Sequence, residues 1–295
     1  CKIAAKNENI VAMTAAMADG TGLKRFRNEY PDRFFDVGIA EGHAVTFAAG
    51  MAAAGLHPVF AVYSSFLQRG FDEVIHDVCI QNLPVIFAID RAGLVGADGE
   101  THQGIMDLSY LSLIPNMTVM APKNKWELAD MLWFASRYDG PVAIRYPRGQ
   151  AYDGLKKFRS PVVWGKSEWL YEESQVAVFA VGNMVERALK VRELLHEKGY
   201  SCSLINARFI KPVDGEAVEK AAENHRLIVT MEENLLHGGY GDAVGEYLEK
   251  LDKDISILRF GISDQFVPHG SVPELQKQVG LDPEDIAEKI AEVLR

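Results

Sequence analysis

The densest group of polar residues in the first half of the sequence is the segment Gly96-Ala97-Asp98-Gly99-Glu100-Thr101-His102-Gln103-Gly104. Its Asp98 and His102 can present a carboxylate and an imidazole to one cleft, a pair suited to proton transfer and to orienting an oxyanion. The segment follows a predicted strand, and loops in that position often carry functional residues. Because Asp and Gly are also common in turns, a capped turn is the alternative interpretation.

Glu41 is a second candidate, because it follows a predicted strand and opens a predicted helix. A carboxylate in the first helical turn interacts favourably with the helix dipole, so simple charge complementarity would account for it. A buried acid at this position would instead hydrogen-bond a nitrogen of a ligand. His43, on the same helix, is interpreted as a packed or solvent-bridged histidine rather than a ligand.

Arg69 and Arg148 are the two arginines that we place at the ligand crevice. Arg69 lies beyond Tyr63 and Phe66, and Arg148 belongs to Tyr146-Pro147-Arg148-Gly149. A guanidinium group matches the oxygens of a phosphate, and a neighbouring glycine lets a substrate approach the backbone. A surface salt bridge is the alternative for either arginine, and sequence spacing does not show whether the two converge.

Several common catalytic motifs are absent from the sequence. The glycine cluster at 238–245 follows a predicted strand and opens a helix, but it lacks the full GxGxxG spacing, so it is interpreted as close helix packing. The sequence has no Walker A lysine loop, HExxH zinc helix or GxSxG elbow. Hydrolase and nucleotide-triphosphatase functions therefore lose their usual support.

The elements that must position these residues alternate between strands and helices, as in βαβ units around a parallel sheet. In the first half the predicted strands are 10–13, 34–39, 58–63, 84–90, 117–121 and 141–145, and the predicted helices are 42–54, 66–81 and 125–137. Ligands of such doubly wound sheets bind beyond the carboxyl ends of the strands. Those positions supply Glu41, Tyr63, Arg91 and Arg148.

A second, smaller α/β unit follows a connection rich in Gly, Lys, Pro and Trp. Its predicted strands are 176–181, 202–205, 227–231 and 255–260, and its predicted helices are 184–198, 215–224, 242–250 and 283–294. We therefore expect an α/β protein of two doubly wound domains. The first spans 1–158, a linker spans 159–173, and the second spans 174–295.

Length and composition agree with a folded two-domain protein. The chain has 295 residues, 48% of them hydrophobic, and a net charge of −10 with no Lys/Arg block, so nucleic-acid binding is disfavoured. Three dispersed cysteines indicate neither a disulfide framework nor a metal site, and favour a cytoplasmic location. No segment is long and apolar enough for a membrane span. Because the chain begins with Cys and enters a strand at residue 10, we expect a trimmed piece or a processed subunit.

One family combines these motifs. The strings that carry the resemblance are Phe35-Asp36-Val37-Gly38-Ile39-Ala40-Glu41-Gly42-His43, Tyr63-Ser64-Ser65-Phe66-Leu67-Gln68-Arg69, the 96–104 loop, Ile89-Asp90-Arg91-Ala92-Gly93, Arg145-Tyr146-Pro147-Arg148-Gly149, Asn206-Ala207-Arg208-Phe209-Ile210-Lys211-Pro212 and Gly261-Ile262-Ser263-Asp264-Gln265-Phe266-Val267. Together they resemble the pyrimidine-binding and C-terminal domains of 1-deoxy-D-xylulose-5-phosphate synthases, thiamine-diphosphate transferases of the transketolase superfamily. The resemblance covers essentially the whole chain.

The resemblance implies condensation of pyruvate with D-glyceraldehyde 3-phosphate, with loss of carbon dioxide, for isoprenoid and thiamine biosynthesis. It implies that Glu41 hydrogen-bonds the pyrimidine ring of thiamine diphosphate and that Phe66 stacks on that ring. Tyr63, Asp98 and His102 would face the reacting centre. The phosphate of the aldehyde would be bound by Arg69 and Arg148.

Three departures from the family pattern qualify this interpretation. Gly42 stands where glutamine is common, and the string from Glu232 to His237 differs from the usual turn there. The family binds the cofactor diphosphate and Mg²⁺ through a separate N-terminal domain, and this chain has no such segment and no metal ligands of its own. We therefore expect the isolated chain to be inactive without that domain or a partner chain that carries it.

Two alternatives stay open. The chain could be the smaller subunit of a split transketolase-like enzyme, or a non-catalytic binding or assembly module when isolated. The superfamily also implies a homodimer, although one sequence does not reveal a self-complementary surface.

Overall fold

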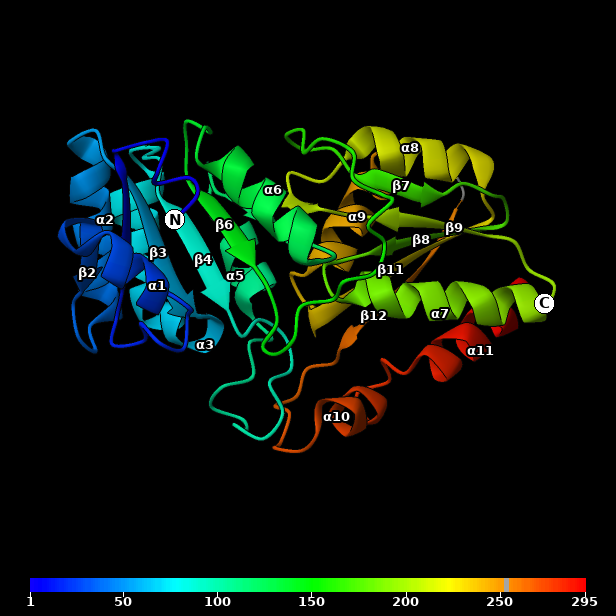
Figure 1. The fold of residues 1–295 in the computed structure, drawn as a ribbon. Helices are drawn as coiled ribbons and strands as arrows, with labels where there is room; N and C mark the ends of the chain where they lie inside the picture. The colour runs from blue at the N-terminus through cyan, green and yellow to red at the C-terminus, as the bar shows by residue number, and fades with distance from the viewer. Residues whose placement is uncertain (252–254) are drawn as a thin grey trace.

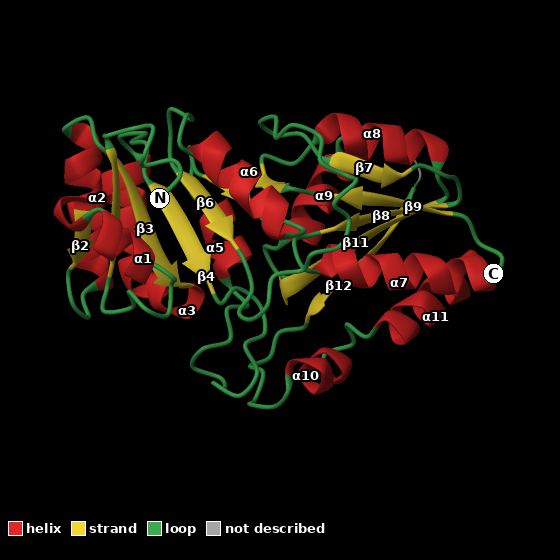
Figure 2. Ribbon diagram, viewed as in Figure 1, coloured by secondary structure: helices red, strands yellow, loops and turns green. Residues whose placement is uncertain are grey.

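The computed structural model describes residues 1–251 and 255–295. Two sheets lie side by side, the first built mainly by the first half of the chain and the second by the second half (Figures 1 and 2). The predicted α/β class, with two doubly wound domains, is confirmed. Within the described residues, no helix combines the length and apolar character that crossing a membrane requires.

The first sheet has seven strands, six of them parallel. In spatial order they are β10 (Phe209–Lys211), β5 (Thr118–Met120), β6 (Val142–Arg145), β4 (Ile86–Asp90), β3 (His57–Tyr63), β1 (Ile10–Thr14) and β2 (Phe34–Asp36). The antiparallel edge strand β10 comes from the second half of the chain. The sequence pattern does not reveal this strand, because three residues carry too little periodicity to identify one.

Helices cover both faces of this sheet. They are α1 (Lys24–Glu29), α2 (Glu41–Ala53), α3 (Ser64–Leu67), α4 (Phe71–Glu73), α5 (Asp107–Ser112) and α6 (Lys125–Ala135). Three further helical segments are the 3₁₀ helices η1 (Pro31–Arg33) and η2 (Gln68–Gly70) and the π-helix η3 (Val74–Cys79). The continuous helix predicted over 66–81 begins two residues earlier and is divided into four short segments. The strand predicted over 34–39 ends at Asp36, because the chain turns at Gly38, whose φ is +72°.

The second sheet has five strands and an antiparallel edge. In spatial order they are β12 (Ser256–Ile262), β11 (Leu227–Leu235), β8 (Val176–Ala180), β9 (Cys202–Asn206) and β7 (Glu168–Tyr171). Its helices are α7 (Met184–Glu197), α8 (Gly215–Asn224), α9 (Tyr240–Glu249), α10 (Val272–Gln278) and α11 (Pro283–Leu294). Strand β7 lies inside the segment 159–173 that sequence analysis treats as a linker; the division of the chain at that segment stays a prediction.

Side chains along β8 point alternately to the two faces of the sheet, so this one strand packs against two helical layers. Ala177 and Phe179 pack in the cluster that contains α8 and α9, whereas Val176 and Val178 pack in the cluster that contains α7 and α11. The α8–α9 cluster continues into the core of the first sheet through residues such as Ala121. One apolar cluster therefore spans both sheets.

Candidate active site

Glu41 is the first residue of α2, and its side chain is only 4% exposed. The turn before it is held by Asp36, whose Oδ1 accepts hydrogen bonds from the backbone N–H of Ala16 (2.8 Å) and of Gly38 (3.1 Å). The Nη1 of Arg69 lies 3.4 Å from the Oε1 of Glu41. The structure thus places a buried carboxylate at a helix N-terminus, where the helix dipole favours negative charge.

An aromatic group lies beside this carboxylate. Tyr63, the last residue of β3, stacks with Phe66 of α3 at a centroid distance of 5.4 Å, and the edge of His102 meets Phe66 at 5.2 Å. The Cζ of Arg69 lies 4.9 Å from the centroid of the Phe66 ring, and the Cζ of Arg91 lies 3.6 Å from that of Tyr63. Strand end, short helix and loop therefore bring together residues far apart in the sequence.

The 96–104 loop is closed at its base and fastened at its tip. Gly93 and Gly104 exchange backbone hydrogen bonds of 2.6 and 2.8 Å, which hold the two ends of the loop together. At the tip, Asp98 pairs with Arg148 at 2.9 Å. The Nδ1 of His102 lies 2.9 Å from the hydroxyl of Thr101, so the loop presents His102 toward Phe66.

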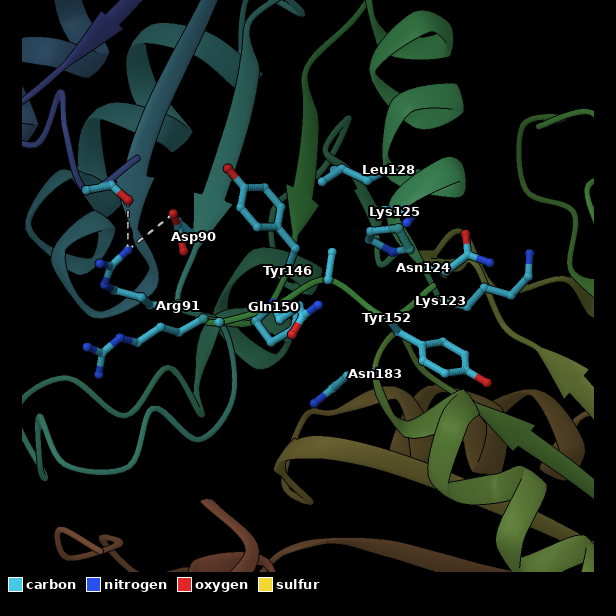
Figure 3. A pocket seen from close by; sticks show the side chains of 16 residues that line it. Asp90, Arg91, Lys123, Asn124, Lys125, Leu128, Tyr146, Gln150, Tyr152 and Asn183 are labelled. Carbon is cyan, nitrogen blue, oxygen red and sulfur yellow. Dashed lines mark hydrogen bonds and ion pairs between the residues drawn. The ribbon is translucent and has the colours of Figure 1, made fainter. Parts of the chain in front are cut away.

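A cavity of about 310 Å³ opens at the carboxyl ends of β4 and β6 (Figure 3). Arg91 lies at its wall, 3.2 Å from a carboxylate oxygen of Asp90, and donates a 3.1 Å hydrogen bond to the carbonyl of Gly20. Arg148 lines the same cavity. This is the position in which a doubly wound sheet binds ligands.

Most of the predicted site residues are joined by direct contacts, but in two groups. Glu41, Arg69, Phe66, Tyr63 and His102 form one continuous series. Asp98 and Arg148 form the other pair. Among the described residues that line the cavity, the arginines are Arg91 and Arg148, whereas Arg69 lies outside the lining. The convergence of Arg69 with Arg148 that the sequence left open is therefore not seen in this cavity.

The sequence pattern identifies Arg91 only as a residue at a strand end and indicates no role for Asp90. Burial raises the pKa of Asp90, and the neighbouring Arg91 opposes this shift. Arg91 has a φ of +60°, a left-handed conformation that is uncommon outside glycine. The strand-end position was the available signal; the backbone conformation that turns Arg91 toward Tyr63 was not visible in the sequence.

Burial is also the main cause that raises the pKa of the Tyr63 phenol, and Arg91 partly offsets it. Tyr63 is therefore a neutral hydrogen-bond donor near pH 7. Together, Tyr63, His102 and Asp98 provide a phenol, an imidazole and a carboxylate within one region. Such a set can hold a hydroxyl group and move a proton.

A network of buried polar groups joins the first half of the chain to the second sheet. Arg145 of β6 pairs with Asp107 at 3.0 Å and donates to the carbonyl of Glu233 at 3.1 Å. The Glu233 carboxylate accepts hydrogen bonds from the N–H of Leu94 (3.1 Å) and the amide of Asn183 (2.9 Å). The departure from the family pattern at 232–237 thus keeps a buried acid that joins the two halves.

The residues present fit the pyrimidine half of thiamine diphosphate. A buried carboxylate at Glu41 can meet a ring nitrogen, and Phe66, which contacts the same Arg69 side chain, offers a stacking surface. The described part of the chain contains no group of three or more His, Cys, Asp or Glu side chains that could hold a metal ion. A magnesium site is therefore not assigned to any of these residues.

Comparison with known proteins identifies the class. The family "Transketolase, pyrimidine binding domain" matches residues 1–153, and "Transketolase, C-terminal domain" matches residues 165–286. The chain belongs to the transketolase family of thiamine-diphosphate enzymes.

Within that family, the curated relatives point to one branch. The chain is 52% identical over 290 residues to the 1-deoxy-D-xylulose-5-phosphate synthase of Lachnoclostridium phytofermentans, covering 98% of this chain and 46% of the relative. It is 51% identical over 292 residues to the synthase of Clostridium tetani, covering 99% of this chain and 47% of the relative. The chain thus spans about half the length of these relatives and resembles them more closely than it resembles the solved structures described next.

Two solved structures share the fold. One, described as a split gene transketolase in an inactive beta4 tetramer, matches with a TM-score of 0.89 at 28% identity and covers 99% of this chain and 93% of its own. Transketolase from Campylobacter jejuni matches with a TM-score of 0.81 at 18% identity, covering 98% of this chain and 45% of its own. At 18% identity, the similarity to the Campylobacter jejuni transketolase shows a shared fold and nothing more.

Proposed function

We propose that this chain is the pyrimidine-binding and C-terminal part of a thiamine-diphosphate enzyme that condenses pyruvate with D-glyceraldehyde 3-phosphate, releasing carbon dioxide and forming 1-deoxy-D-xylulose 5-phosphate. The observation that carries the proposal is that the buried carboxylate of Glu41 and the ring of Phe66 both contact one side chain, that of Arg69. The identity of 52% to a synthase supports the choice of reaction within the family.

Bound thiamine diphosphate would supply the carbanion chemistry, and the residues of this chain would bind and orient it. We assign to Glu41 a hydrogen bond with a ring nitrogen of the pyrimidine, and to Phe66 a stacking contact with the ring. The burial of Glu41 excludes water from that hydrogen bond, which strengthens it.

The aldehyde substrate would occupy the cavity at the ends of β4 and β6. Arg148 and Arg91 line it, so we assign its phosphate to these two guanidinium groups. This replaces the role that sequence analysis gave to Arg69, which lies outside the cavity lining. Tyr63, Asp98 and His102 would orient the carbonyl and hydroxyl groups and transfer protons.

The remaining parts of the active site would come from outside this chain. We propose that the diphosphate and Mg²⁺ are held by the portion of the longer relatives that this chain does not span, so the isolated chain turns over little substrate. Assembly as a homodimer in the cytoplasm is part of the same proposal. Neither nucleic acid nor a membrane is proposed as a partner.

A second candidate is the smaller chain of a split transketolase. It is favoured by one observation: the split gene transketolase chain is matched over 93% of its length. Identity favours the synthase, since it is 28% to that chain and 52% to the L. phytofermentans synthase. An assay with pyruvate and with a ketose donor distinguishes the two.

The test uses a chimaera in which this chain replaces the matching portion of the L. phytofermentans relative. We expect carbon dioxide release from pyruvate that depends on D-glyceraldehyde 3-phosphate.

Glu41→Gln should lower turnover about 10²- to 10⁴-fold, because the variant side chain loses its acid character. The control is Glu246→Gln, which makes the same change at an exposed carboxylate in helix α9. A near-normal rate for Glu41→Gln would discard the assigned role, and turnover with a ketose donor in place of pyruvate would favour the split transketolase.

A further inference from the structure

Arg69 contacts both of the groups that the proposed function assigns to the pyrimidine ring. Its planar guanidinium group is paired with the carboxylate of Glu41 at 3.4 Å and lies 4.9 Å from the centroid of the Phe66 ring. A bound pyrimidine would need the same two interactions, a hydrogen bond to Glu41 and a stacking contact with Phe66. The arginine and the ring therefore compete for one carboxylate and one aromatic surface.

Arg69 is free to leave this position, because its side chain is 59% exposed while that of Glu41 is 4% exposed. An ion pair with one exposed partner and a cation–π contact near the surface are both weak. A ligand can therefore displace the Arg69 guanidinium group, provided that this group finds another partner for its positive charge.

Glu73 is placed to be that partner. It lies four residues after Arg69, where the 3₁₀ turn η2 leads into α4, so both side chains start from the same short stretch of chain. The structure describes no hydrogen bond or ion pair for the Glu73 side chain. Its Oε1 lies 2.7 Å from the point where a Cβ on Gly42 would stand, and the carbonyl of Arg69 lies 3.4 Å from the same point. Glu73 and Glu41 therefore flank the same helical turn.

We propose that Arg69 is an internal competitor of the cofactor ring, and that Glu73 receives its guanidinium group when the ring binds. The proposal rests on the proposed function and adds an exchange of one arginine between two carboxylates, Glu41 in the empty site and Glu73 in the filled site. Arg69 and Glu73 are then positioning residues that set the affinity for the pyrimidine. The apparent affinity falls by the fraction of molecules in which Arg69 still covers Glu41.

Gly42 gives the Glu73 side chain the space that the exchange requires. Where glutamine is common in the family, this chain has glycine, and a side chain at this position would collide with the carboxylate of Glu73. The glycine leaves room for Glu73 beside α2. Gly42→Gln should therefore push Glu73 away from Arg69 and weaken ring binding in the same direction as removal of the Glu73 charge.

The experiment measures binding of thiamine to the 295-residue chain by NMR titration, without any assay of turnover. Arg69→Met should tighten binding about five- to tenfold, because it removes one partly exposed ion pair and one cation–π contact from the empty site. Glu73→Gln and Gly42→Gln should each weaken binding about threefold. Asp72→Asn, a charge change of the same size at an exposed neighbour of Glu73, is the matched control and should bind as the unmodified chain does.

The outcomes separate this inference from the proposed function. Weaker binding in Arg69→Met, or unchanged binding in both Glu73→Gln and Gly42→Gln, would overturn the exchange while binding lost in Glu41→Gln still supported the pyrimidine site. Thiamine binding that is unaffected by Glu41→Gln would overturn the pyrimidine site itself, and the exchange with it. A thermal unfolding curve for each variant confirms that the fold is retained.

Discussion

Two buried glutamates show how strongly the surroundings decide the chemistry of one residue type. Burial raises the pKa of Glu232 to about 7, although the N–H groups of Gly241 and Tyr240 oppose the shift. Glu168 is also buried, yet the ammonium of Lys123 and the guanidinium of Arg208 lower its pKa to about 2. Desolvation dominates at Glu232, for which the described residues provide no ion pair, whereas ion pairs dominate at Glu168.

This difference predicts the pH dependence of stability. Because the pKa of Glu232 is about 7 in the folded state and 4.5 as the ordinary value, the folded state binds more protons between these pH values. The stabilising contribution of Glu232 is therefore fully present below pH 4.5 and is lost as pH rises to 7. Over this range the free energy of unfolding falls by about 3 kcal/mol. Urea unfolding at pH 5 and pH 8 measures it.

Glu232→Gln should remove most of that difference between pH 5 and pH 8, since glutamine does not titrate. The control is Glu246→Gln, which changes an exposed carboxylate in α9 and should keep the pH dependence of the unmodified chain. An equal pH dependence in the Glu232→Gln variant would show that this residue is not its source.

At the scale of elements, short segments join the two halves. Strand β10, three residues long, leaves the second half and pairs with β5, Phe209 opposite Met120. The Phe209 ring is fully buried and meets the edge of Phe134 in α6 at 5.9 Å. One edge strand thus carries a large apolar side chain into the core of the other half.

Phe209→Ala tests this connection. We expect it to lower the free energy of unfolding by about 3–5 kcal/mol, because the truncation leaves a cavity between β5 and α6. Denaturant unfolding is the measurement. Phe266→Ala, at a ring that is 74% exposed, is the control and should change stability by less than about 0.5 kcal/mol. A loss in Phe209→Ala as small as that of the control would mean that β10 does not join the cores.

At the scale of the whole molecule, one buried polar cluster and one apolar core cross between the sheets. Glu127 of α6 accepts hydrogen bonds from Lys123 (3.0 Å), from Asn206 (2.9 Å) and from Arg208 (2.6 Å). Lys123 also pairs with Glu168 at 2.6 Å. Because α6 belongs to the first half and Asn206 to the second, the cluster holds the cavity wall at Lys123 in place.

We therefore expect the chain to unfold in one cooperative transition. Scanning calorimetry should give equal calorimetric and van't Hoff enthalpies. Glu127→Gln should lower the free energy of unfolding by about 3–5 kcal/mol, because it leaves the two buried cations, Lys123 and Arg208, with the single carboxylate of Glu168. Two separate transitions in the unmodified chain would contradict this view of the molecule as a single unit.

Local patterns were sufficient for the strands and helices that are long enough to show their period. The predicted helix 215–224 agrees with α8 residue for residue, and 283–294 agrees with α11. Strand-end positions singled out Glu41, Tyr63, Arg91 and Arg148, since parallel strands end at one edge of a sheet. The elements that the local patterns do not reveal are short: the edge strands β7 and β10, and the helices α1, α5 and α10 of six or seven residues.

The contacts between these residues were decided by the tertiary structure alone. Arg69 lies on Glu41, 28 positions earlier, and Arg148 pairs with Asp98, 50 positions earlier, so neither contact has a local signature. The sequence by itself determined the periodic elements, the family and the set of polar side chains at the sheet edge. The folded chain decided which carboxylate each arginine meets, because ion pairing depends on distance in space and on burial, whereas periodicity reports only on neighbours along the chain.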